Sequence, residues 1–141
     1  MTLSLDQARA IVEGTRAAGK QHGFKPLTVV VLDAGGHVVA AEREDGASNK
    51  RFEIAFGKAH GAIALGMGSR ALMARAEQQP YFIAAVTQSA GPLIPVPGGV
   101  LIQNAEGALV GAVGVTGDTS DNDETAAVAG IEAAGLVGQP G

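Results

Sequence analysis

The sequence predicts a single α+β domain built from two β-hairpins and several helical segments. Its 141 residues, 46% of them hydrophobic and 17% charged, are typical of one globular core. Apolar residues recur with helical spacing near both ends of the chain, and two pairs of β-rich segments are each joined by a short turn that contains glycine. No linker divides the chain, so we expect residues 1–141 to form one domain.

The first helix is predicted over residues 4–22, where apolar residues fall on one helical face. Ser4 and Gln7 have the spacing of a capping box, in which each side chain accepts a hydrogen bond from the other residue's backbone N–H. Gly23 is placed to end the helix.

Two hairpins follow from the turn chemistry. The first pairs residues 27–32 with residues 37–41 across the turn at residues 33–36, and the second pairs residues 100–103 with residues 109–115. Glycines within the last of these strands, Gly111 and Gly114, indicate that another backbone or a ligand approaches closely.

Further helices are predicted between and after the hairpins. Ser48 is the expected N-cap of a second helix that ends before Gly66, and a short helix is expected from Ser69 to about Gln79. A further helical turn is expected over residues 80–87. Three prolines make residues 89–99 an extended connection. The last helix is expected over residues 120–134, with Asp121 and Glu124 in capping-box spacing.

Composition excludes several functional classes. Ten Lys and Arg against fourteen Asp and Glu give a net charge of −4, and aromatic residues make up only 4% of the chain. Without a basic cluster or exposed rings, nucleic acid is not an expected partner. No apolar run approaches the ~20 residues that span a bilayer, and the N-terminus reads as a helix start rather than a secretion signal. We therefore expect a cytoplasmic protein with no membrane partner. The absence of cysteine excludes disulfides and thiol catalysis.

Three histidines, His22, His37 and His60, are the only side chains that ordinarily exchange protons near neutral pH, and they are the candidate haem ligands, of which at most one would serve. His22 lies near a helix end and His37 at a hairpin, where each has a structural explanation. His60 falls beside the apolar stripe of the second predicted helix, so it would face a cleft or solvent.

Arg51 and Lys58 are seven residues apart, about two helical turns, so both would project from one side of the second helix. Such a pair would suit haem propionates or another carboxylate, and a solvated helix face is the alternative. The loop before the last helix would offer backbone N–H groups to an anion, or its Ser120, Asp121 and Glu124 would simply cap the helix.

Several short motifs together resemble the GlcG/HbpS family, also known as DUF336 or the haem-degrading-domain family. They are residues 33–39, 43–47, 56–59, 97–99 and 111–117, followed by Asp123 and Glu124. The resemblance implies a profilin-like antiparallel sheet of about five strands flanked by helices, and assembly into a homo-oligomer. It also implies a pocket where residues 56–59, 97–99 and 116–117 meet, although no histidine inherits a ligand role from these motifs.

The leading hypothesis is a small-molecule-binding protein with haem or a related tetrapyrrole as its ligand. Its expected binding residues are Arg51, Phe56, Lys58, Gly98, Gly99, Thr116 and Gly117.

The alternative is a catabolic enzyme that moves protons on a small carboxylated metabolite by isomerisation, tautomerisation or ring opening. His60 or Glu53 would then be the base, Lys58 or Arg51 would hold the anion, and N–H groups near Gly98, Gly99 and Thr116 would stabilise developing charge. A structural assembly subunit is the third hypothesis.

Overall fold

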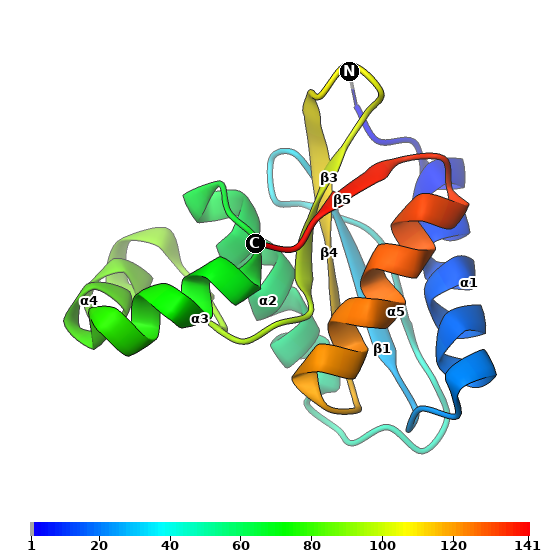
Figure 1. The fold of residues 1–141 in the computed structure, drawn as a ribbon, viewed down its shortest axis with the longest axis horizontal. Coiled ribbons are helices and arrows are strands. Elements are labelled where there is room, and N and C mark those ends of the chain that lie inside the picture. The colour runs from blue at the N-terminus through cyan, green and yellow to red at the C-terminus, as the bar shows by residue number, and fades with distance from the viewer. Residues whose placement is uncertain (1) are drawn as a thin grey trace.

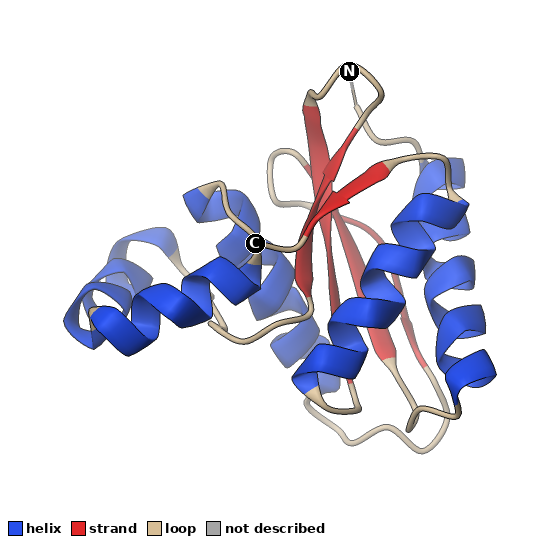
Figure 2. Cartoon of the chain, in the orientation of Figure 1, coloured by secondary structure: helices blue, strands red, loops and turns tan. Residues whose placement is uncertain are grey.

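The computed structural model describes residues 2–141 as five helices and one five-stranded sheet (Figures 1 and 2). The helices are α1 (Leu5–His22), α2 (Arg51–Leu65), α3 (Ser69–Gln78), α4 (Pro80–Ala90) and α5 (Ser120–Ala133). The strands are β1 (Thr28–Asp33), β2 (Val38–Arg43), β3 (Gly99–Gln103), β4 (Leu109–Thr116) and β5 (Val137–Gln139). The predicted α+β class is confirmed.

The sheet has the order β2-β1-β4-β3-β5, and every neighbouring pair is antiparallel. Both predicted hairpins, β1–β2 and β3–β4, are present, and the pairing of β1 with β4 joins them into one sheet. Strand β5 lies at the edge beside β3 and completes the five strands that the family resemblance implied.

Helices cover the two faces of the sheet unequally. Figure 1 shows α1 and α5 side by side on one face and α2 on the other, with the α3–α4 hairpin projecting beyond α2. Alternating strand residues therefore enter different cores: Val29 and Val31 pack with α1 and α5, whereas Val30 and Leu32 pack with α2. Helix α2 meets the sheet through Ala55, Ala59 and Ala62, all fully buried.

Small side chains let α2 approach the sheet closely. A Cβ at Gly114 of β4 would overlap the carbonyl oxygen of Ala55 in α2. A Cβ at Gly111 would overlap the carbonyl oxygen of Leu32 in the neighbouring strand β1. The close backbone approach expected at these two glycines is thus provided by the protein itself.

Helix termini are where the structure departs most from the sequence prediction. Helix α1 has the predicted capping box and ends at Gly23, whose φ is +70°. Helix α2 begins at Arg51, and Ser48 accepts a hydrogen bond from the Arg51 side chain instead of capping the helix. Helix α4 continues to Ala90, three residues beyond the expected end.

Helix α5 is capped by Thr119, whose hydroxyl accepts from the Asn122 N–H. The predicted capping roles of Asp121 and Glu124 were wrong because both carboxylates instead pair with Arg70 of α3. These ion pairs connect the α3–α4 hairpin to the body of the domain.

No helix within residues 2–141 is both long enough and apolar enough to cross a membrane.

Candidate functional site

Lys58 lies at the centre of a buried polar cluster between α2, β4 and the start of α5. Its side chain is only 2% exposed, and its Nζ donates to the Val115 carbonyl at 2.9 Å and to Asp123 Oδ2 at 3.1 Å. The other carboxylate oxygen of Asp123 accepts the Asp118 N–H at 2.9 Å. Lys58 is therefore engaged inside the protein and does not present its ammonium group to a ligand at the surface.

Burial opposes the charge on both members of this pair. It lowers the pKa of Lys58 and raises the pKa of Asp123, because each charged form has lost its hydration. Their mutual attraction and hydrogen bond offset part of that cost. A nearby second cation, Arg51, lowers the pKa of Lys58 further.

Gly98 and Gly99 belong to the wall of the same cluster. A Cβ at Gly98 would lie 2.8 Å from Lys58 Nζ, and a Cβ at Gly99 would overlap the Lys58 carbonyl. The Gly99 N–H donates to Ser69 Oγ at 2.7 Å, in a buried contact. The structure thus accounts for both glycines by close packing around Lys58, and the Gly99 donor is already used.

Arg51 and Thr116 meet at the edge of this cluster. Arg51 Nη1 donates to Thr116 Oγ1 at 2.9 Å, and Arg51 Nε donates to Ser48 Oγ at 2.9 Å. A shallow depression of about 200 Å³ opens beside the guanidinium, with Gly117 in its wall. The structure therefore brings Arg51, which belongs to none of the family motifs, next to Thr116 and Gly117.

The loop that leads into α5 fills its own donor groups. The Asp118 carboxylate accepts N–H bonds from Lys25 and Thr119 and a further bond from the Asn122 amide. These bonds, led by that from Lys25, lower the pKa of Asp118. Two N–H groups of the loop, those of Asp118 and Thr119, are thus already bound to the protein's own carboxylates.

A second, chemically different surface lies on the opposite flank of α2. Phe52, Phe56 and His60 follow one another at helical spacing and stack, with ring centroids 6.1 Å apart for the first pair and 5.3 Å for the second. Phe52 is 39% exposed, while Phe56 and His60 are half-buried. We call these three residues the aromatic ladder.

The orientation of the His60 imidazole is fixed by one hydrogen bond. Its Nδ1 lies 2.8 Å from the Pro92 carbonyl oxygen. Since a carbonyl only accepts, Nδ1 carries the proton in this contact and Nε2 keeps its lone pair when the ring is neutral. Nε2 makes no hydrogen bond within residues 2–141, and a Cβ at Gly36 would lie 3.9 Å from it.

The other two histidines have plainer surroundings. His22 is exposed at the end of α1 and stacks on Phe24 at 5.2 Å. His37 is 82% exposed in the first hairpin turn, with its Nδ1 3.3 Å from Asp33 Oδ1. Within residues 2–141, no three His, Asp or Glu side chains are grouped so that they could hold a metal ion.

The residues expected to form one site therefore divide between two flanks of α2. Arg51 and His60 are nine residues apart, about two and a half turns, which places them on opposite sides of the helix. Glu53 lies on the flank of His60, but it is 59% exposed and 3.8 Å from Lys50. The enzyme hypothesis required a histidine or glutamate base beside the cations Arg51 and Lys58. The structure does not bring His60 or Glu53 to that side of the helix.

Two residues that position these groups were missed at the level of sequence. Asp123 belonged to a motif of the family resemblance, but nothing local marked it as the partner of a lysine 65 residues away. Pro92 contributes only its carbonyl, which any residue type offers, so no sequence signal identified it.

Comparison with solved structures shows the same fold in several proteins. HbpS is 28% identical, with a TM-score of 0.80 over 94% of this chain and 89% of its own. The structure of a double mutant of Streptomyces reticuli HbpS has the same identity and TM-score, and 86% of that chain is covered. A PduOC:heme complex has a TM-score of 0.85 at 22% identity, covering 96% of this chain and 97% of that one.

The Klebsiella pneumoniae protein ORFY, described by the DUF336 family model, has a TM-score of 0.84 at 24% identity over 96% of this chain and 92% of its own. A search of curated proteins found no match. The family model described as "Haem degrading protein HbpS-like" matches residues 3–132, nearly the whole chain. The chain therefore belongs to the HbpS-like family, DUF336.

Proposed function

We propose that this protein binds haem or a related tetrapyrrole on the aromatic ladder of α2, where His60 would hold the iron through Nε2. The observation that carries the proposal is the His60 imidazole, whose Nδ1 is held at 2.8 Å by the Pro92 carbonyl. Histidines that ligate metals commonly donate their second ring N–H to a carbonyl or carboxylate, which fixes the tautomer and the ring orientation.

The surroundings of His60 suit a large apolar ring. Phe56 stacks against the imidazole, and Phe52 extends the ladder. Val38 of the neighbouring strand β2 is 47% exposed, and its partner Leu32 belongs to the α2 side of the sheet. A tetrapyrrole would cover these exposed apolar groups, and when bound it would supply an iron centre for ligand exchange or electron transfer.

The propionates of such a ligand would not meet Arg51 and Lys58. Lys58 is buried, and Arg51 lies on the opposite flank of α2 from His60. Arg43 of β2 is exposed, but it pairs with Thr28 at the end of the strand away from Val38. Thr28 also pairs with Thr116, the partner of Arg51. We therefore assign the carboxylates to solvent.

The comparisons support this proposal at two levels. The matching family model is described as haem-degrading, and HbpS at 28% identity is among the similar structures. The PduOC:heme complex is a complex of haem with a protein of this fold.

A haemin titration followed by absorbance tests the proposal. We expect a saturable shift of the Soret band with about one site per chain. His60→Ala should abolish the shifted band, because removal of the imidazole removes the iron ligand. His22→Ala and His37→Ala are matched controls that should bind as the wild type does.

Two results would overturn the assignment. A wild-type titration that matches free haemin would exclude haem binding. An unaltered Soret shift in His60→Ala, with loss in one of the other variants, would move the ligand away from the aromatic ladder. Thermal unfolding of each variant distinguishes loss of the ligand from loss of the fold.

A further inference from the structure

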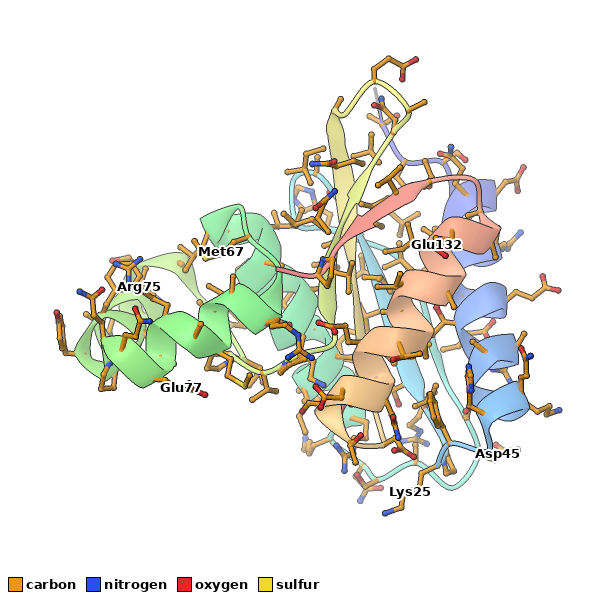
Figure 3. All side chains as sticks on the ribbon, in the orientation of Figure 1. Lys25, Asp45, Met67, Arg75, Glu77 and Glu132 are labelled. Carbon is orange, nitrogen blue, oxygen red and sulfur yellow. The ribbon has the colours of Figure 1, made fainter. Side chains whose placement is uncertain are left out.

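A depression on the far flank of α2 from His60 is lined by two cations and no acidic residue. It has a volume of about 200 Å³, and its lining residues are Lys25, Pro26, Gly46, Ala47, Ser48, Arg51 and Gly117. Figure 3 shows Lys25 at the end of the molecule opposite the hairpin turns. The nearest acidic groups lie outside the lining: Asp45 lines a neighbouring depression, and Asp118 accepts the Lys25 backbone N–H.

The Arg51 guanidinium is held in place without being neutralised. Its two protein partners, Ser48 Oγ and Thr116 Oγ1, are uncharged hydroxyls, each 2.9 Å away. Of its five N–H donors, three make no hydrogen bond within residues 2–141. Arg51 is half-buried, and no carboxylate among the described residues forms an ion pair with it.

The nearby charges are paired with each other rather than with Arg51. Lys58, whose pKa is lowered slightly by Arg51, already has Asp123 as its partner. The Asp118 carboxylate accepts the Lys25 N–H and two further hydrogen bonds, and it forms no ion pair with Arg51. A ligand carboxylate beside Arg51 would therefore give the guanidinium a direct partner that the described residues do not supply.

We propose that this depression is a binding site for a small carboxylate, held by the free N–H groups of Arg51 with Lys25 as the second cation. A planar guanidinium matches the two oxygens of a carboxylate, and the two hydroxyls fix its orientation before binding. The volume suits a molecule of a few heavy atoms and is below the range typical of drug-sized ligands. The site is separate from the aromatic ladder and does not depend on haem binding.

Nuclear magnetic resonance tests the proposal directly on ¹⁵N-labelled protein. Sodium acetate and sodium glycolate are titrated at constant pH and ionic strength, with sodium chloride and sodium phosphate as parallel titrants. We expect saturable shifts of the Arg51 Nε–H and Gly117 amide signals with the carboxylates, at millimolar dissociation constants, and only small linear shifts with chloride.

Variants locate the site. Arg51→Gln should weaken carboxylate binding by at least about tenfold, equivalent to about 1.4 kcal/mol. Lys25→Gln removes an exposed cation from the wall and should weaken binding a few-fold; it supplies the test if Arg51→Gln fails to fold. Arg9→Gln makes the same charge change at an exposed position, about 20 Å along α1 from the helix end at His22, and should bind as the wild type does.

Several outcomes would overturn the proposal. Carboxylate shifts that match those of chloride would exclude a specific site, as would equal weakening in Arg9→Gln and Lys25→Gln. Saturation with phosphate alone would exclude the carboxylate class. Haemin binding is measured separately through His60, so failure of either proposal leaves the other to its own test.

Discussion

Replacement of Lys58 by methionine is the perturbation that most directly tests the buried cluster. Methionine has a similar volume and fills the space of the lysine stem, but it removes the ammonium group that contacts Asp123 and the Val115 carbonyl. Asp123, only 1% exposed, would then keep the Asp118 N–H as its remaining donor.

The loss of stability expected for Lys58→Met follows from the isolation of the buried Asp123 carboxylate. Loss of one partner from a buried ion pair leaves an uncompensated charge and costs about 3–5 kcal/mol. Natural domains are stable by about 5–15 kcal/mol, so Lys58→Met should remove a large share of the free energy of unfolding. In a chain of this size the midpoint of thermal unfolding should fall by roughly 10–18 °C.

Urea unfolding followed by circular dichroism measures this cost, with a double-mutant cycle to isolate the pair. Asp123→Asn keeps an acceptor for the Asp118 N–H but leaves Lys58 without its counter-charge. The double variant should cost about 1–3 kcal/mol less than the sum of the two single changes. Lys50→Met is the control, because Lys50 is 81% exposed and should contribute less than about 1 kcal/mol.

Two results would refute this reasoning. One is a Lys58→Met variant within about 1 kcal/mol of the wild type, since orphaning a buried charge costs more than that. The other is a double variant whose cost equals the sum of the singles, because coupling is the signature of a direct interaction.

Two further predictions concern pH and packing. Hydrogen bonds lower the pKa of Asp118 below its ordinary value of 3.8. The contribution of Asp118 to stability is therefore complete above pH 3.8 and is lost as the pH falls through the lowered pKa. Asp118→Asn should flatten this part of the acid-unfolding curve, and an unchanged curve would contradict the prediction. Gly114→Ala would force a Cβ against the Ala55 carbonyl and should lower the free energy of unfolding, measured in urea, by about 3 kcal/mol or more. Gly138→Ala is the control, because the nearest atom to its new Cβ would be Val100 Cγ1 at 3.2 Å, and it should cost less than about 1 kcal/mol. Equal effects of the two substitutions would contradict the packing argument.

Local sequence signals predicted those elements that are stabilised by their own residues. The capping box of Ser4 and Gln7 defined the start of α1, and Gly23 defined its end. Alternating β-branched segments around glycine turns predicted both hairpins. These features depend on contacts within a few residues, so the chain encodes them locally.

Elements that depend on distant partners were not predictable in the same way. The residue pattern alone did not predict β5, because its three residues form a strand only by pairing with β3. The roles of Asp121 and Glu124 were misassigned because their partner, Arg70, lies more than 50 residues away in the sequence.

The candidate site shows the same division. Helical spacing predicted that Arg51 and Lys58 lie on one side of α2 and that His60 lies beside its apolar stripe. Spacing does not report burial, however, so the sequence could not distinguish Lys58, inside the domain, from Arg51, at the rim of a depression.

The sequence by itself thus determined the α+β class, the two hairpins, most of the helical segments and the side of α2 on which each charged or aromatic residue lies. Only the tertiary structure decided which of those sides faced the core. Helix α5 and strand β4 enclose Lys58, while β2 leaves the aromatic ladder partly open. The physical reason is that backbone periodicity is a property of neighbouring residues, whereas burial and the pairing of charges are set by segments that meet only when the chain has folded.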